Sequence, residues 1–371
     1  MKIAIEAQRI FRKNKHGMDF VILELIIELQ KLDLTNEYFI LVGPGEDRCF
    51  QESSNFHLIE LKSSFYPLWE QYLLPRAIKK IKPDFLHCTS NTAPLSCSVP
   101  LIITLHDIIF MEKQQGKNTS LYQQMGWYYR GLIVPKVIKK CAMVITVSNY
   151  EASRIKAATK LPKERIKVLY NSANKKFKPF GKKREDISIS YIKEKTFFFF
   201  LGNTDPKKNT KNTLIAYSMY LKESTKKIHL LIADLQENVV DSYIKEAGIE
   251  FIKPFIHFAG YIPNNDLPSI YNKAFAFLYP SLRESFGIPV LEAMACGTPL
   301  ITSNTSALPE IAGSGAILTD PHNPKDIAKK MIKLENDPDF YAKNVSYGIE
   351  RAKSFSWESS AHRLISLYES I

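Results

Sequence analysis

The sequence lacks long hydrophobic runs. No stretch of its 371 residues approaches the roughly 18 apolar residues that a membrane-spanning helix needs. The longest apolar runs, Phe197–Leu201 and Phe275–Tyr279, have the length of buried strands. The first residues carry an acid at Glu6 and no apolar core, which predicts an opening strand and not a signal peptide. Hydrophobic residues make up 45% and charged residues 24%, which excludes a disordered chain and, at this length, predicts two domains.

Cysteine is scarce as well, and no C-x-x-C pair occurs among Cys49, Cys88, Cys97, Cys141 and Cys296. Scattered and odd in number, they indicate free thiols in a reducing compartment and exclude a disulfide framework. No group of histidine, cysteine and carboxylate residues shows the spacing of a metal site. We therefore expect no cofactor and no required metal, and a cytoplasmic location.

Acidic residues are too few to balance the basic ones, and the imbalance is uneven. Residues 1–180 contain 27 Lys and Arg against 16 Asp and Glu, whereas residues 181–371 contain 23 against 22. Almost all of the net charge of +12 therefore lies in the first half. This asymmetry suggests an anionic partner, such as a membrane surface, nucleic acid or a phosphorylated substrate. Lysine acting only as a solubilising residue is the alternative.

Two alternating series of strands and helices follow one another along the chain. In the first, a helix is expected over 68–81 with a kink at Pro75. A lysine-rich stretch of weak periodicity, residues 174–195, interrupts the pattern, which restarts with the strand Thr196–Leu201. Such alternation is typical of parallel sheets covered by helices on both faces. The predicted fold is α/β, with two Rossmann-like, doubly wound domains facing across a cleft, residues 1–180 and 181–355.

The densest chemical signal lies between Glu284 and Gly297. Pro289 suits the first helical position and Gly297 the position just past a helix end. Residues 285–288 then form a tight loop at a helix N-terminus, which is a ready anion site. Glu284 precedes this helix and Glu292 lies about one turn inside it. They cannot serve one atom together, but two carboxylates beside a phosphate loop suit a nucleotide sugar.

These residues carry a resemblance to a known family. Glu284 and Glu292 reproduce the E-x7-E signature of retaining glycosyltransferases of family 4, which have the two-Rossmann GT-B fold. The segment from Phe200 to Asn209 resembles the phosphate loop of that family. Further motifs fall in the same order over nearly the whole chain, namely Leu105–Asp107, Val147-Ser148, Tyr170-Asn171, Phe258–Ile262, Leu308–Glu310 and Phe355–Glu358. The resemblance also implies that a C-terminal helix, about 356–371, packs back on the N-terminal domain.

The resemblance implies catalytic roles for three side chains. His106 would lie beside the sugar, Lys208 would hold the diphosphate, and Glu284 would contact sugar hydroxyls. It implies substrate binding by a larger set that contacts phosphate, sugar, ribose and base: Gly17, Asp107, Ser148, Asn203, Lys207, Tyr261, Ile262, Ser285, Phe286, Gly287, Ile288 and Glu292.

Individual roles within the larger set follow from the same resemblance. Gly17 would let the backbone approach the donor phosphate, and Glu292 would accept hydrogen bonds from the ribose. Tyr261 and Ile262 would frame the base through backbone groups. The family often has an arginine where this chain has Asn203, so Lys207 is expected to supply the second charge on the diphosphate.

Two aromatic and basic segments of the first half predict a surface for anionic lipid. They contain Trp69, Tyr72, Arg76, Lys79, Lys80 and Lys82, and Trp127, Tyr128, Tyr129, Arg130, Lys136, Lys139 and Lys140. The alternative is that the aromatic rings pack inward while the lysines face water.

The function expected is a retaining hexosyl transfer in polysaccharide biosynthesis. A nucleotide-diphosphate sugar, with GDP-mannose as the first choice, would be the donor. A glycan or lipid-linked hydroxyl would be the acceptor. A nucleotide-sugar epimerase of the same fold remains an alternative, as does a non-catalytic protein that binds anionic lipid or nucleic acid. Because no nucleic-acid motif is recognised, nucleic acid is not expected as a partner.

Overall fold

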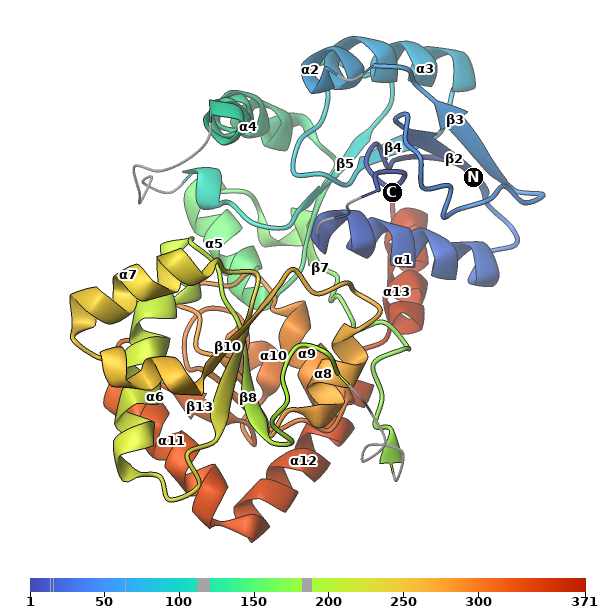
Figure 1. The fold of residues 1–371 in the computed structure, drawn as a ribbon. Coiled ribbons are helices and arrows are strands. Elements are labelled where there is room, and N and C mark those ends of the chain that lie inside the picture. The colour runs from blue at the N-terminus through green and yellow to red at the C-terminus, as the bar shows by residue number, and fades with distance from the viewer. Residues whose placement is uncertain (14, 16, 64, 112–120, 182–188) are drawn as a thin grey trace. The chain divides into compact units, whose positions relative to one another are not determined.

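The structure is a computed structural model that describes residues 1–13, 15, 17–63, 65–111, 121–181 and 189–371 (Figure 1). The chain divides into two compact units. The first comprises Met1–Asn171 together with Ser356–Ile371, and the second comprises Ser172–Phe355.

The division differs slightly from the boundary expected at residue 180, because residues 172–180 are bound to the second unit. The Asn272 side chain accepts a hydrogen bond from the Phe180 N–H (2.9 Å) and donates one to the Lys178 carbonyl (3.0 Å). The ring of Phe177 packs against Tyr271 with centroids 5.9 Å apart.

The first unit is built on a seven-stranded sheet of order β3-β2-β1-β4-β5-β6-β7, and all its ladder pairings are parallel. Its strands are β1 (Lys2–Glu6), β2 (Glu37–Val42), β3 (Phe56–Glu60), β4 (Phe85–Cys88), β5 (Leu101–Leu105), β6 (Met143–Thr146) and β7 (Ile166–Val168). Its α-helices are α1 (Gly17–Leu32), α2 (Tyr66–Leu68), α3 (Leu74–Ile81), α4 (Leu121–Lys140), α5 (Asn149–Thr159) and α13 (Trp357–Glu369).

The second unit has a six-stranded parallel sheet of order β10-β9-β8-β11-β12-β13. Its strands are β8 (Phe197–Leu201), β9 (His229–Ala233), β10 (Ile256–Gly260), β11 (Ala276–Tyr279), β12 (Leu300–Ser303) and β13 (Ile317–Thr319). Its α-helices are α6 (Thr210–Glu223), α7 (Glu237–Ala247), α8 (Leu267–Lys273), α9 (Ile288–Ala295), α10 (Leu308–Ala312), α11 (Pro324–Asn336) and α12 (Pro338–Lys353). The prediction of two Rossmann-like α/β domains is confirmed.

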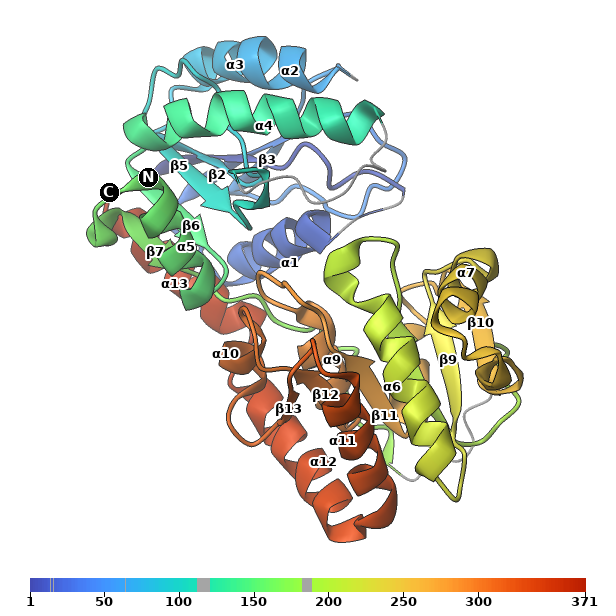
Figure 2. The ribbon, with the colours of Figure 1, turned by 90° about the vertical axis from the view of Figure 1, so that its left-hand side faces the viewer.

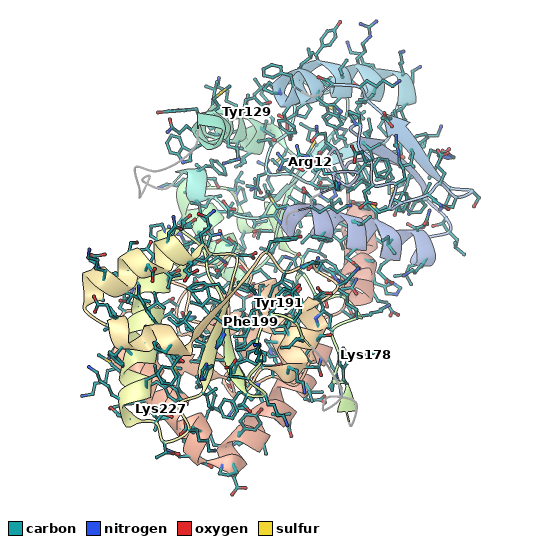
Figure 3. The ribbon with its side chains drawn as sticks, viewed as in Figure 1. Arg12, Tyr129, Lys178, Tyr191, Phe199 and Lys227 are labelled. Carbon is teal, nitrogen blue, oxygen red and sulfur yellow. The ribbon has the colours of Figure 1, made fainter. Side chains whose placement is uncertain are left out.

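The central strand β8 shows why this sheet is buried on both faces. Successive side chains of a strand point to opposite faces. Phe198 contacts Tyr220 of α6, whereas Phe199, labelled in Figure 3, contacts Tyr271 of α8. On the first of these faces α6 lies beside α11 (Figure 2). An unbroken apolar strand is stable here because helices cover both of its faces.

The helix expected over 68–81 is interrupted by a π-helical turn, Trp69–Leu73, between α2 and α3. The Leu74 N–H bonds to the Trp69 carbonyl, five residues earlier. This wider turn brings Pro75, which has no N–H to donate, into the first turn of α3. The predicted kink at Pro75 therefore takes the form of a π-turn just before it.

The C-terminal helix α13 packs against α1 of the first unit. Its Tyr368 hydroxyl lies 2.7 Å from Nδ1 of His87 on β4, and the Nε2 atom of that imidazole lies 2.7 Å from the Thr104 hydroxyl. Burial lowers the pKa of His87 to about 3, so the ring is neutral at physiological pH. This buried polar contact fixes α13 on the first sheet.

The chain enters and leaves each unit at adjacent points. In the first unit the Ser360 hydroxyl donates to the Tyr170 carbonyl (2.6 Å). In the second unit the Ser172 hydroxyl donates to the Phe355 carbonyl (3.0 Å). Residues 183 positions apart in sequence thus lie side by side.

Candidate functional site

The second unit has a topological switch point between β8 and β11. Strands β9 and β10 lie on one side of β8, whereas β11, β12 and β13 lie on the other. The loops that leave the carboxyl ends of β8 and β11 therefore diverge, which creates the crevice where ligands bind in open α/β sheets. The first loop contains a short 3-10 helix, Pro206–Lys208, and the second leads into α9.

Three side chains, two from these loops and one from the end of β11, form one cluster. Nζ of Lys208 donates to Oε1 of Glu284 (2.7 Å) and to the Tyr279 hydroxyl (2.9 Å). Tyr279 in turn donates to the same carboxylate oxygen (2.9 Å). The Lys208 and Glu284 side chains are only 22% and 12% exposed. The structure therefore brings together two of the three residues predicted to be catalytic.

Charge at this cluster is stabilised by mutual proximity. Burial lowers the pKa of Lys208, but Tyr279 and the Glu284 carboxylate outweigh burial and leave that pKa above its ordinary value. Burial, reinforced by the same carboxylate, raises the pKa of Tyr279. Lys208 therefore carries a permanent positive charge. The Tyr279 hydroxyl keeps its proton, which it donates in a hydrogen bond to Glu284.

Asn209 locks the loop that carries Lys208. Its backbone adopts the left-handed region, with φ 60°, and it is the N-cap residue of α6. The buried side-chain amide donates to the carbonyls of Pro280 (2.9 Å) and Pro321 (2.7 Å), in the loops that follow β11 and β13. The Lys207 carbonyl also accepts a hydrogen bond from Leu282 (2.7 Å). The cluster is therefore held by a rigid frame before any ligand binds.

Helix α9 follows the loop that carries Glu284, with Gly287 as its N-cap residue. The glycine has φ 96°, and a Cβ there would lie 2.9 Å from Leu308. The helix begins at Ile288, so Pro289 takes the second position and not the first as expected. The opening N–H groups of such a helix have no carbonyl partner within it, and they favour an anion.

The predicted loop residues beside Gly287 have different environments. Phe286 is buried against Phe355, with ring centroids 6.1 Å apart, so only its backbone can face a ligand. Ser285 and Ile288 are half-buried. The Glu284 N–H donates to the Ser306 hydroxyl (3.1 Å), which anchors the loop to the segment after β12.

Glu292 lies on α9 and faces α8. The Tyr271 hydroxyl donates to its Oε2 atom (3.2 Å). Burial raises the pKa of Glu292 to about 7, against an ordinary value of 4.5. Glu284 lies in the loop before α9 and Glu292 lies within α9. The Glu292 carboxylate is not part of the Lys208 cluster.

A pocket of about 480 Å³ lies at the carboxyl ends of β9 and β10 and is lined by Asp234, Leu235, Gln236, Glu237, Phe258, Gly260 and Tyr261. Tyr261 is 73% exposed, whereas the neighbouring Ile262 is buried. Burial raises the pKa of Asp234, and the Lys208 ammonium opposes that shift. Asp234, which lines the pocket, therefore lies within electrostatic range of Lys208.

Lys207, expected to supply the charge of the missing arginine, forms a separate turn with Asn203 and Asp205. Oδ1 of Asn203 accepts from the Asp205 N–H (2.9 Å), and Asp205 in turn accepts from the Lys207 N–H (3.0 Å). Nζ of Lys207 pairs with the Asp205 carboxylate (3.3 Å). The structure thus directs Lys207 toward Asp205 while Lys208 is directed toward Glu284.

The predicted residues of the first unit lie at the carboxyl ends of its strands and at helix starts. His106 follows β5, is buried, and has its Nε2 atom 3.0 Å from the Thr89 carbonyl. A carbonyl can only accept, so Nε2 carries the proton and Nδ1 is left as an acceptor. Burial lowers the pKa of this imidazole.

Two further predicted residues, Asp107 and Ser148, accept hydrogen bonds from backbone N–H groups that follow them in the chain. Asp107 accepts a hydrogen bond from the Ile109 N–H (3.0 Å), and Ser148 is the buried N-cap residue of α5, accepting from Glu151 (3.1 Å). Gly17 opens α1, and a Cβ there would meet no atom within 4 Å. Packing within the chain therefore does not require glycine at this position.

Sequence reasoning missed several residues that build the site. Tyr279 was interpreted only as a strand end, and Asn209 only as part of a loop. An asparagine directly before a helix, where it is a favoured N-cap residue, was the available signal for the second. Spacing along the sequence did not indicate one further group: the fold brings Glu194, His229 and His257 together, although 35 positions separate the first two.

Comparison with known proteins relates each half of the chain to sugar transfer. Residues 16–176 match the family described as Glycosyltransferase Family 4. Residues 182–351 match the family described as Glycosyl transferases group 1.

Two curated relatives are named as mannosyltransferases. O-antigen chain mannosyltransferase B of Escherichia coli is 28% identical over 61% of this chain and 60% of its own length. O-antigen chain mannosyltransferase RfbU of Salmonella typhimurium is 28% identical over 77% of this chain and 75% of its own. Against the Escherichia coli WbdA mannosyltransferases, the match spans only 36–37% of the relative.

Solved structures share the fold over the whole chain. The Anabaena Alr3699/HepE protein in complex with UDP superposes with a TM-score of 0.75 at 15% identity, covering 100% of both chains. WaaG, a glycosyltransferase involved in lipopolysaccharide biosynthesis, gives 0.70 at 13% identity, covering 98% of this chain and 99% of the other.

The raised pKa of Glu292 generates a prediction about stability. A carboxyl whose pKa is raised in the folded chain stabilises the fold while protonated, and this contribution is lost as pH rises from about 4.5 to about 7. Glu292→Gln removes the ionisation, so the variant should gain stability over the parent across this range, by up to about 3 kcal/mol. Thermal unfolding without ligand from pH 5 to 8, with Glu223→Gln on the exposed end of α6 as control, measures the difference. A difference that does not change with pH would contradict it.

Proposed function

The chain is built as a glycosyltransferase of the GT-B fold, and on that basis we propose that it transfers mannose from GDP-mannose with retention of configuration. The acceptor is a hydroxyl of a glycan or lipid-linked glycan in polysaccharide biosynthesis. The reaction needs no metal, and the protein works at an anionic membrane surface.

The Lys208–Glu284–Tyr279 cluster is the observation that carries this proposal. It puts one cation and one carboxylate at the switch point, beside the N-terminus of α9 and the pocket at Asp234. Lys208 and the helix start offset the negative charge that builds on the leaving diphosphate. The carboxylate contacts the sugar, and the pocket takes the nucleoside end. Because these charges are fixed in advance, the diphosphate is stabilised without a bound cation.

The weakness of the candidate nucleophile at this place fits retention by a same-face displacement better than retention through a covalent sugar–enzyme intermediate. Glu284 accepts from both Lys208 and Tyr279 through one oxygen, which lowers its nucleophilicity. In the proposed step the bond between the anomeric carbon and the phosphate oxygen breaks while the acceptor oxygen bonds to the same face. The acceptor proton goes to the leaving phosphate. Nδ1 of His106 accepts a hydrogen bond from a sugar hydroxyl, and this contact orients the sugar ring.

The names of the relatives support mannose as the sugar, because both O-antigen proteins described above are mannosyltransferases. The expected result is that GDP and GDP-mannose raise the unfolding temperature, whereas UDP, ADP and their sugars do so less at equal concentration. A ligand present at 100 times its Kd stabilises by about 2.7 kcal/mol, which a thermal-shift measurement resolves. A larger shift with a uridine or adenosine nucleotide would exclude the guanosine donor.

The two carboxylates should affect different kinetic constants. Glu284→Gln should lower kcat much more than it weakens nucleotide binding, because its contact with the sugar counts mainly in the transition state. Glu292→Gln should weaken donor binding by about 1.5–3 kcal/mol, the value of a hydrogen bond to a charged group. Initial rates and GDP titrations of both variants test this, with Glu223→Gln as control. Turnover within about twofold of the parent in both variants would refute the site assignment.

A membrane surface is supported by the exposed side chains of α2, α3 and α4. Exposed apolar residues on these helices and just before α2 are Phe65, Leu68, Tyr72, Met125, Tyr128 and Leu132. Lys79, Lys80, Lys82, Lys136, Lys139 and Lys140 are exposed as well. Gln71 and Tyr129 are hydrogen-bonded (2.9 Å), so the two helical segments lie together.

Part of the predicted aromatic surface is interior instead. Trp69 is fully buried and donates its indole N–H to the Leu61 carbonyl (3.0 Å), and Tyr129 donates to Glu70. Within the described part of the chain, no helix combines the length and apolar character needed to cross a bilayer. The proposed association rests on charge and a few exposed apolar side chains.

Vesicle binding should depend on lipid charge. Each basic residue near an anionic surface contributes about 1 kcal/mol, and salt weakens this attraction as the Debye length falls to about 3 Å at 1 M. We expect cosedimentation with anionic vesicles, release by salt, and weaker binding after Lys79, Lys80 and Lys82 are changed to Gln. A matched triple change of exposed lysines in the second unit, Lys222, Lys245 and Lys329, is the control. Equal binding to neutral and anionic vesicles, or no binding to either, would remove the membrane from the proposal.

A further inference from the structure

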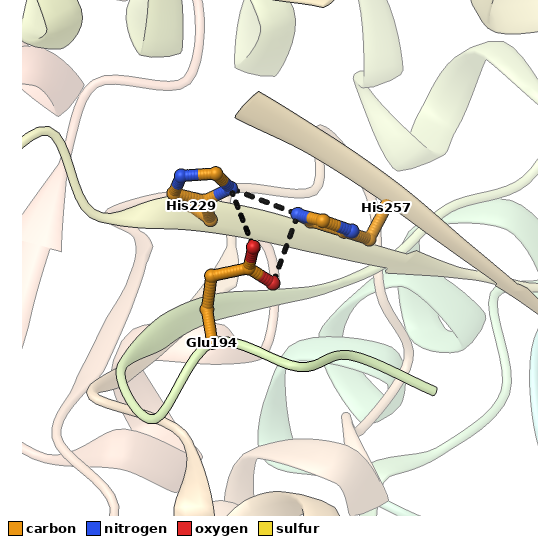
Figure 4. A group of neighbouring side chains, drawn as sticks. All are labelled: Glu194, His229 and His257. Carbon is orange, nitrogen blue, oxygen red and sulfur yellow. Dashed lines mark hydrogen bonds and ion pairs between the residues drawn. The ribbon is translucent and has the colours of Figure 1, made fainter. Parts of the chain in front are cut away.

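Two imidazoles and one carboxylate meet at the amino-terminal edge of the second sheet (Figure 4). His229 is the first residue of β9, and His257 is the second residue of β10. His257 is the register partner of Leu231, which shares a face with His229, so the two rings come from the same face of the sheet. Glu194 reaches them from the segment that precedes β8.

The three groups converge through atoms that bear lone pairs. Nδ1 of His229 and Nε2 of His257 are 2.8 Å apart. The Glu194 carboxylate lies 3.8 Å from the first nitrogen through Oε1 and 3.2 Å from the second through Oε2. One potential ligand atom from each residue can be chosen so that all lie within 4.8 Å of one another.

With both imidazoles neutral, the cluster contains a negative carboxylate and no positive charge. Where the two nitrogens meet, one imidazole donates a hydrogen bond and the other accepts it, whereas the carboxylate can only accept hydrogen bonds. Oε2 of Glu194 is buried and accepts no hydrogen bond from the described residues. A cation at the centre of the three atoms would satisfy each of them.

The cluster is open to solvent and held in place by its surroundings. The three side chains are 25%, 27% and 33% exposed, so an ion can enter. Two of the ligands are fixed by neighbouring strands of the sheet. The third is carried by a segment that is itself tied down, because the Tyr191 hydroxyl donates to Asp266 (2.9 Å).

We propose that Glu194, His229 and His257 form a binding site for one zinc ion. Two imidazole nitrogens and a carboxylate oxygen are ligands that zinc prefers, with water as the fourth ligand. Zinc–nitrogen bonds of about 2.0–2.1 Å put tetrahedral ligands about 3.3 Å apart. The present separations of 2.8, 3.2 and 3.8 Å lie on both sides of that value, so shifts of a few tenths of an ångström suffice.

The position in the sheet gives this ion a structural role. The Lys208 cluster lies at the carboxyl ends of the strands, and the imidazoles lie at their amino ends. With a rise of about 3.3 Å per residue, a five-residue strand separates the two by roughly 13–16 Å. The ion therefore cross-links the segment before β8 to β9 and β10 and takes no part in sugar transfer. This inference does not rest on the proposed function.

Zinc titration of the whole protein tests the site. After chelation and removal of the chelator, calorimetry should show one zinc bound per chain, and zinc should raise the unfolding temperature by several degrees. The double variant His229→Ala/His257→Ala should bind roughly tenfold more weakly or worse. The control His322→Ala/His362→Ala removes the same number of imidazoles from exposed positions and should bind like the parent.

Further variants and measurements distinguish zinc binding from a folding defect and from proton binding. Glu194→Gln keeps the size of the side chain and should weaken zinc binding while the metal-free unfolding temperature stays close to that of the parent. Equal zinc affinity in the parent and in both cluster variants would overturn the proposal. An unfolding temperature that changes with pH but not with zinc would also overturn the proposal, because the three groups would then bind only a proton.

Chelation distinguishes this site from the proposed reaction. EDTA should lower the unfolding temperature of the zinc-loaded protein but leave sugar transfer intact. Loss of transfer in EDTA that Mg²⁺ or Mn²⁺ restores would contradict the metal-independent reaction while leaving the zinc titration as an independent result.

Discussion

The ion pair between Lys208 and Glu284 is the contact on which the candidate site depends. Each group is mostly buried, and neither charge is stable there without the other. The loops after β8 and β11 must therefore converge, and the amide of Asn209 holds both of them. A diphosphate would offer Lys208 a second anionic partner and release Glu284 toward the sugar. In the ligand-free chain the two groups are each other's partner.

Sequence patterns could predict the sheets because burial on both faces leaves a simple signal. The apolar run Phe197–Leu201 coincides with β8, and the apolar run Phe275–Tyr279 contains β11 and one residue before it. No comparable run marks β3 or β13. Most of β3 is only half-buried, and β13 has three residues, so neither gives a clear pattern.

The contacts of the site were less predictable because they depend on side chains from distant segments. Glu284 and Lys208 could be singled out by motif, but the bridging hydroxyl of Tyr279 depends on register at the end of a buried strand. The grouping of Glu194 with His229 and His257 depends on the order β10-β9-β8 in the sheet, which spacing along the chain does not reveal. The π-turn before Pro75 likewise depends on one backbone hydrogen bond, from the Leu74 N–H to the Trp69 carbonyl, which residue spacing does not reveal.

The adjacent entry and exit of the chain have a consequence for how such a protein can change over time. The second unit is a continuous stretch of sequence whose two ends are joined by the hydrogen bond from Ser172 to Phe355. A segment whose ends lie side by side can be replaced by another segment. The first unit, including helix α13, then needs only two neighbouring junctions, before Ser172 and after Phe355. The second unit could therefore be replaced as one module, without rebuilding the half that carries β1–β7.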